Sequence, residues 1–160
     1  MAVKLPKMTL KGVQFRKLKL DITADVLVGG EVVEGYPVGW VLLRGQQDSV
    51  FLKKYTPHLR EYQDILADAQ EKIKVEPENK ELVDEQTKLL EDATQKLLVL
   101  TVACAIEEWD EEFFGEPFSQ QAAIDCFSDD DNNQVYNQIA LAVRNRDSFL
   151  PIVSVQPTNG

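Results

Sequence analysis

The sequence predicts an α+β domain that is mainly helical, and three observations support this. Its 160 residues, 44% of them hydrophobic, suit one compact domain with a modest core. Apolar residues alternate with polar ones near the N-terminus but recur every three or four residues in the middle of the chain. A Gly/Pro turn then precedes two short amphipathic segments. We therefore expect a single domain with a basic arm (1–12), a small antiparallel β-sheet (13–45), a long helical hairpin (57–109), a C-terminal lobe of short helices (110–150) and a flexible tail (151–160).

Residues 13–45 have the pattern of β-structure. Val13, Phe15 and Ile22 lie among Lys, Arg, Gln and Asp in an imperfect period-two pattern, as in a half-buried strand. Gly29-Gly30 and Glu34-Gly35 are turn signals, which divides the region into three short strands. So small a sheet needs helices packed on one face to be stable.

The middle of the chain has the pattern of two helices. The stretch Ser49–Tyr55 fits either a strand or a first helical turn, whereas Thr56-Pro57 is a typical helix start. A break at Val75–Pro77 ends this helix, and we expect the next to run from Pro77 to Trp109 as the second arm of an antiparallel hairpin. Its second half is apolar on nearly all sides and must be buried.

The lobe that follows has clear turn and capping signals. Gly115 and Pro117 mark a turn, and Ser119 is placed to cap a short helix over 120–127. The acidic run Asp129–Asn133 opens another helix, because carboxylates stabilise the N-terminus of a helix. Phe149 closes the lobe, and the last ten residues are expected to be extended or disordered.

Charge is distributed unevenly along the chain. The formal net charge is −10, yet the first 20 residues hold six bases and no acid, and the segment from Glu107 to Asp131 holds ten acids and no base. An acidic body repels nucleic acid. The basic arm fits either a solvated tail, which we favour, or a contact with an acidic surface or nucleic acid. No apolar run is long enough to span a bilayer, and the N-terminus does not look like a secretory signal. We therefore expect a soluble cytoplasmic protein that binds neither nucleic acid nor membrane.

The sequence does not predict catalysis, a metal site or a cofactor. The acidic run resembles the start of a calcium loop, but Gln134 replaces the required glycine and Ala140 the bidentate glutamate. His58 is the one histidine and has no nucleophile beside it in the sequence. Cys104 and Cys126 are expected to be reduced and buried. We expect a binding protein rather than an enzyme.

An aromatic cluster supplies the candidate partner-binding residues. Aromatic side chains dominate the energetics of protein interfaces, but they also hold small helices onto longer ones. Either role, or both for different residues, is open for the cluster of Trp109, Phe113, Phe114, Phe118 and Phe127.

Several short motifs follow one another in a recognisable order. Ile106–Asp110 (I-E-E-W-D) precedes Gly115–Ser119 (G-E-P-F-S), two predicted short helices and a closing Phe149-Leu150, and upstream the sequence G-W-V-L-L-R-G is followed by Asp48-Ser49. In this order the chain resembles the tail assembly chaperones of long-tailed bacteriophages and related prophages, with the upstream part similar to one branch of that family. The resemblance covers about residues 31–150 and is firmest over 99–150.

The resemblance implies a non-enzymatic role in tail assembly. Such proteins bind the tape measure protein, a long and largely helical chain, keep it soluble in the host cytoplasm, help recruit the tail tube protein, and are absent from the mature virion. The alternative is a structural virion component, such as a head–tail connector or a tail-tube-associated protein. The sequence leaves the oligomeric state open.

Overall fold

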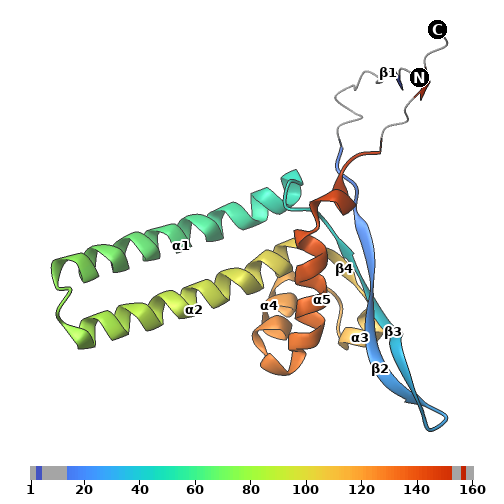
Figure 1. Ribbon diagram of the computed structural model, residues 1–160, viewed down its shortest axis with the longest axis horizontal. Coiled ribbons are helices and arrows are strands. Elements are labelled where there is room, and N and C mark those ends of the chain that lie inside the picture. The colour runs from blue at the N-terminus through green and yellow to red at the C-terminus, as the bar shows by residue number, and fades with distance from the viewer. Residues whose placement is uncertain (1–2, 5–13, 153–155, 158–160) are drawn as a thin grey trace.

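A three-stranded antiparallel sheet forms one side of the molecule. In the computed structural model of the chain, we describe residues 3–4, 14–152 and 156–157 (Figure 1). Strands β2 (Leu18–Val28) and β3 (Glu31–Leu43) form one long hairpin, and β4 (Ile106–Trp109) pairs with the end of β3 to give the order β2-β3-β4. Gly29 and Gly30 both have positive φ, as a tight two-residue hairpin turn requires.

The expected three short strands within 13–45 are therefore wrong, because this region forms only two long strands. Gly35 makes no turn between strands. Its N–H donates to a carboxylate oxygen of Asp25 over 3.1 Å, next to a register irregularity between Ala24 and Val26. With φ of 65°, the glycine absorbs a bulge and lets β3 continue.

The third strand comes from a segment predicted as the end of a helix. Helix α2 ends at Ala105, and Ile106–Trp109 is extended with both end residues buried. The N–H of Arg44 donates to the carbonyl of Ala105, and the N–H of Asp110 to that of Trp40. A helix continued to Trp109 would remove these hydrogen bonds along β3 and just beyond it, so pairing with the sheet prevails over helical periodicity.

The predicted helical hairpin is present, but its helices begin elsewhere than expected. Helix α1 runs Ser49–Val75, so Ser49–Tyr55 is helical and the expected start at Thr56-Pro57 is wrong. Asp48 caps α1 by accepting from the N–H of Val50, and buried Phe51 anchors the first turn by stacking on Tyr55.

The second helix is capped in the same way. Helix α2 runs Lys80–Ala105, and Asn79 accepts from the N–H of Leu82. The expected start at Pro77 is therefore three residues early, because the side chain that can cap the helix lies at position 79.

Short helices form the C-terminal lobe, as predicted. After α3 (Glu111–Phe114) and a left-handed Gly115, Ser119 caps α4 (Gln120–Ser128). The acidic run forms a short 3-10 helix, η2 (Asp130–Asn132), capped by Asp129, and leads into α5 (Asn133–Arg144). A last 3-10 turn, η3 (Arg146–Phe149), places Phe149 against Gly45.

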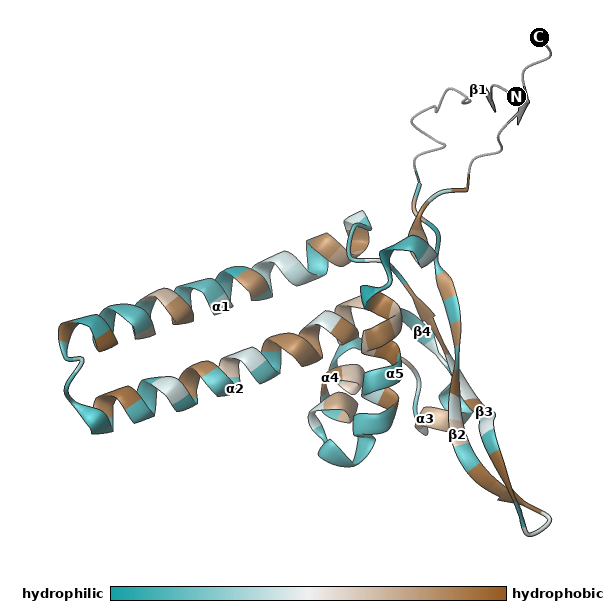
Figure 2. Cartoon of the chain, in the orientation of Figure 1, coloured by the Kyte–Doolittle hydropathy of each residue, from teal (hydrophilic) through white to brown (hydrophobic). Residues whose placement is uncertain are grey.

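The core is built around the apolar half of α2, as the sequence predicts. Residues 99–106 are buried except for the half-buried Thr101, and they are enclosed by strands β3 and β4, the lobe and the first turn of α1. Hydrophobic residues gather where α2 enters this body, while the outer halves of α1 and α2 project away as an antiparallel pair (Figures 1 and 2). Outside the body, this pair buries only Ala69 and Gln86 among its described residues.

The two ends of the described chain lie side by side. Strand β1 (Val3–Lys4) pairs antiparallel with β5 (Gln156–Pro157). The remaining residues of the predicted basic arm (1–12), and residues 153–155 and 158–160 of the predicted tail, lie outside the described part of the chain.

Replacing Pro57 by alanine should stabilise the fold. Proline inside α1 removes a backbone donor and crowds the preceding turn, so Pro57→Ala is expected to raise the free energy of unfolding by about 1–3 kcal/mol in urea denaturation. Pro77→Ala is the matched control, since Pro77 lies in the turn between the helices and should give no comparable gain. A Pro57→Ala variant no more stable than the parent would contradict an uninterrupted α1.

Candidate partner-binding surfaces

The aromatic cluster is packed between the sheet and the lobe. The indole of Trp109 stacks on the ring of Phe114, with centroids 4.1 Å apart and planes 6° apart, and meets the edge of Phe118 at 5.4 Å. The Trp109 indole N–H donates to the carbonyl of Glu116 over 2.9 Å. Only 3% of Trp109 is exposed. This residue therefore holds the turn that contains Glu116 against the sheet.

The other members of the cluster extend this contact. Phe127 of α4 is 5% exposed and meets Phe114 edge-on at 6.4 Å. Phe113 covers Gly39 of β3, where a β-carbon would come within 2.5 Å of the Phe113 ring. The cluster thus joins strands β3 and β4 to the lobe.

The position of each aromatic residue bears on its predicted role. Trp109 and Phe127 lie in the core, whereas Phe113, Phe114 and Phe118 are half-buried. Phe118 lines a hollow with Trp109 and three glutamates, Glu107, Glu108 and Glu111. Partner binding by the half-buried phenylalanines stays a prediction.

A charged triad connects this hollow to the sheet. The Glu107 carboxylate lies 2.7 Å from the Lys17 ammonium and 2.7 Å from the Arg44 guanidinium. Burial alone would raise the pKa of Glu107, but the hydrogen bonds and positive charges of Lys17 and Arg44 outweigh it and hold this pKa below its ordinary value. Glu107 therefore stays ionised at neutral pH and ties β4 to the start of β2 and the end of β3.

A second surface lies where the helical hairpin meets α5. A hollow of about 230 Å³ is lined by apolar and aromatic side chains of three helices, with Gln46, Thr101 and Arg144 at polar positions. We call this hollow the α5-side groove; its apolar lining is Tyr55, Leu98, Val102, Tyr136, Ala140 and Val143.

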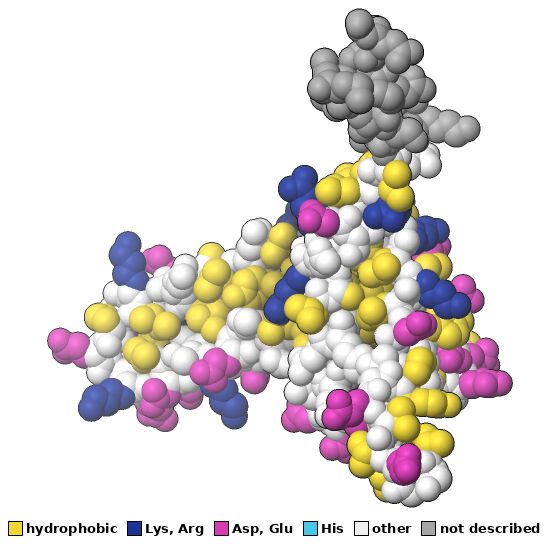
Figure 3. Space-filling model, turned by 45° about the vertical axis from the view of Figure 1, so that its right-hand side comes forward, with side chains coloured by type: hydrophobic (Ala, Val, Ile, Leu, Met, Phe, Trp, Pro, Cys, Tyr) yellow, Lys and Arg dark blue, Asp and Glu magenta, His cyan; other side chains and the backbone are white. Residues whose placement is uncertain are grey.

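An apolar stripe leads outward from the α5-side groove. Three leucines of α1 are spaced by seven residues, namely Leu52, Leu59 and Leu66. They therefore lie on one side of the helix, close to the side on which Tyr55 lies. Leu52 is 45% exposed and Leu98 38% exposed. Figure 3 shows hydrophobic side chains gathered in a strip along the projecting pair of helices. No third helix covers this strip among the described residues.

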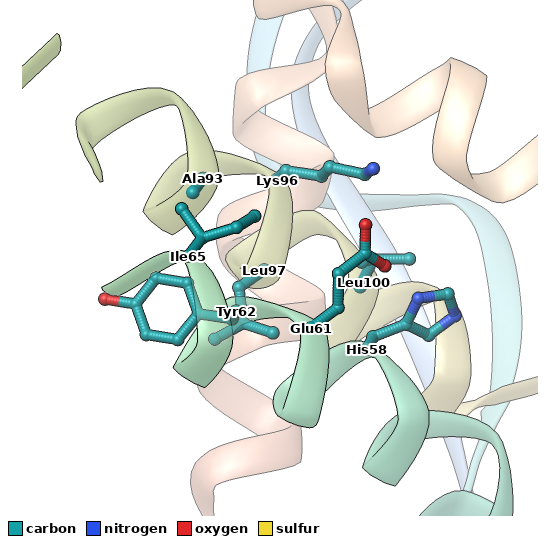
Figure 4. Close-up of a pocket in the computed structure, with 8 residues that line it drawn as sticks. All are labelled: His58, Glu61, Tyr62, Ile65, Ala93, Lys96, Leu97 and Leu100. Atoms are coloured by element: carbon teal, nitrogen blue, oxygen red, sulfur yellow. The ribbon is translucent and has the colours of Figure 1, made fainter. Parts of the chain in front are cut away.

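His58 lies in a smaller pocket between α1 and α2. Its neighbours there include Glu61 and Lys96, which lie toward the same end of the pocket, while Tyr62 points toward the other end (Figure 4). The pocket has a volume of about 30 Å³, room for about one water molecule. The lining of this pocket among the described residues includes no serine, threonine or cysteine beside His58.

The two cysteines are free thiols, and the acidic run contributes a helix cap. Burial raises the pKa of the Cys104 thiol to about 11, against the opposing effect of the Lys54 charge, so this thiol stays protonated at neutral pH. Cys126 is half-buried and also free. Asp129 accepts from the N–H of Asp131, as a cap does. Among residues 3–4, 14–152 and 156–157 no group of three potential metal ligands occurs.

Comparisons with protein-family models, with curated proteins and with solved structures find no match to this chain. Within its described residues, no helix combines the length and the apolar character needed to cross a membrane.

Sequence reasoning missed two surfaces. The α5-side groove joins residues of α1, α2 and α5 that are far apart in the chain, so no local pattern could reveal it. The far end of the β2–β3 hairpin exposes Leu27 and Val32. The sequence has apolar residues on both sides of Gly29-Gly30, which could have indicated an apolar hairpin end. A strand pattern alone does not show whether other elements cover the two faces of that hairpin.

Truncating Trp109 should test whether the aromatic cluster holds the lobe in place. Trp109→Ala is expected to lower the free energy of unfolding by about 3–5 kcal/mol, because it leaves a cavity in the core. Trp40→Ala is the control: Trp40 is half-buried beneath the Lys19 ammonium and should cost clearly less in the same denaturation experiment. A Trp109→Ala protein of parental stability that lost partner binding would instead place Trp109 in an interface.

Proposed function

We propose that this protein is a tail assembly chaperone that binds the tape measure protein in the host cytoplasm and keeps it soluble. In this proposal the protein has no catalytic activity, helps recruit tail tube subunits and is absent from the mature virion. The resemblance over 99–150 suggests the family, and the α5-side groove with its apolar stripe is the observation that carries the proposal.

The groove suits a helical partner. Two antiparallel helices bury only the seam between them, so their outer faces remain open to a third helix. An amphipathic helix laid along the stripe would cover Leu52 and Leu98 and place a side chain in the hollow beside Tyr136. Burying a leucine contributes about 1.5–3 kcal/mol, so a few such contacts are enough for useful affinity.

The charge of the body suits a chaperone. Residues 21–160 hold 27 acids and 11 bases. Repulsion between such acidic bodies opposes aggregation while an apolar partner is held. It also favours partners that carry lysine or arginine beside their apolar face.

Co-expression with a tape measure protein of the same phage or prophage, as this proposal requires, is the test. The parent protein should increase the soluble fraction of the tape measure protein severalfold, and Leu52→Ser combined with Leu98→Ser should abolish that gain. The matched control is Leu141→Ser, which removes a leucine that is exposed on α5 outside the groove and should leave the gain intact.

Two results would count against this account. A tape measure protein equally insoluble with and without the chain would overturn the proposed function. If a folded Leu52→Ser/Leu98→Ser variant still solubilised the tape measure protein fully, the proposed function would stand, but the α5-side groove and its stripe would not be the binding site.

A further inference from the structure

The far end of the β2–β3 hairpin forms an apolar projection, which we call the wing (residues 24–37). It extends past the lobe into solvent (Figure 1), and Figure 3 shows hydrophobic and acidic side chains together on it. Leu27 and Val32 are a cross-strand pair, 72% and 69% exposed, and Val28, Val33 and Tyr36 are exposed as well. Apolar side chains gathered on so small a ribbon indicate an interaction surface.

The wing also has an open backbone edge. Strand β4 pairs only with residues 41–43 of β3, so it does not reach the wing. On β2, the Gln138 amide of α5 accepts from the Thr23 N–H over 2.9 Å and donates to the Thr23 carbonyl over 2.8 Å, as a neighbouring strand would. Beyond Thr23, the described elements other than β3 make no hydrogen bond to β2 between Ala24 and Val28.

The two edges of the wing are not equivalent. Every residue of β2 from Ala24 to Val28 carries a backbone donor, whereas Pro37 of β3 has none. Strand β3 also carries the irregularity at Gly35, so the edge of β2 is the more regular of the two for an added strand.

Charge selects among possible occupants. Between Leu20 and Leu43 the chain has no lysine or arginine and four exposed acids: Asp21, Asp25, Glu31 and Glu34. A second copy would bring four further acids against these four, and nucleic acid or an anionic lipid surface would be repelled in the same way. A protein segment that alternates apolar residues with lysine or arginine complements both the apolar pair and the acids.

We propose that the wing binds an extended, basic and apolar segment of another protein, which adds as a strand to the edge of β2. The backbone of the segment pairs with Ala24–Val28, and its apolar side chains cover Leu27 and Val32. Glu31 pairs with Val28 and lies on the face opposite Leu27, so lysine or arginine side chains on the other face of the segment lie near Glu31. Asp25 shares the face of Leu27, where a basic residue next to the apolar ones of the segment would meet it. This site is separate from the α5-side groove and does not depend on the proposed function.

The experiment uses a fluorescent peptide of alternating lysine and valine, titrated with the whole protein and followed by anisotropy at physiological salt. The parent protein should bind it, and Leu27→Ser/Val32→Ser should weaken binding at least about tenfold. Because both side chains are mostly exposed, this variant should keep the parental melting temperature. Leu141→Ser, which removes an exposed leucine outside the wing, should bind as the parent does.

Peptides of alternating lysine and serine, or glutamate and valine, should bind at least about tenfold more weakly, since each lacks one of the two complementary features. Equal binding by the parent and the wing variant, equal binding of the lysine–serine peptide, or no binding of the lysine–valine peptide would each overturn the proposal. So would a parent protein that dimerises in sedimentation while the wing variant is monomeric, because the occupant would then be a second copy.

Discussion

The rest of the structure depends on burying the apolar end of α2. Residues 99–106 are hydrophobic around most of the helix, so a single neighbour cannot cover them, and the sheet, the lobe and the first turn of α1 all pack on this segment. Burial of each large aliphatic side chain contributes about 1.5–3 kcal/mol, more than any surface ion pair in the molecule can supply. Helix α2 ends at Ala105 and strand β4 begins at Ile106, with no loop between them. The position of the core helix is therefore fixed relative to the sheet.

This arrangement fixes the positions of the surfaces that remain open. Trp109 at the end of β4 carries the aromatic contacts that bring α3 and α4 over the sheet, and Gln138 ties α5 to β2. The α1–α2 pair and the wing leave the body in different directions, and within the part of the chain that the structure describes no third element covers the apolar residues of either (Figure 1). A core of modest size thus supports two projections that expose apolar side chains on a body of strongly acidic composition.

The sequence predicted the features that local chemistry decides. The α+β class, the helical hairpin, the buried half of α2 and the Ser119 cap follow from periodicity and capping side chains. Two predictions were wrong because tertiary contacts prevail over local patterns. The segment Ile106–Trp109 was predicted as helix, but it pairs with β3 as a strand. Helix α1 was predicted to begin at Thr56-Pro57, but it begins at Ser49, because buried Phe51 anchors its first turn and Pro57 lies inside the helix. The sequence identified the aromatic cluster, but only the packing shows that Trp109 and Phe127 are core residues, and the groove and the wing come from contacts and exposure that no local pattern encodes.

Hydrogen exchange of the free protein tests the central claim that one buried segment supports two open projections. Amides of residues 99–109 should exchange only through global unfolding, while those of the wing and the outer halves of α1 and α2 exchange through local openings of lower free energy. Protection spread evenly over the core, the wing and the outer hairpin would contradict the account, because the projections would then be as firmly packed as the core.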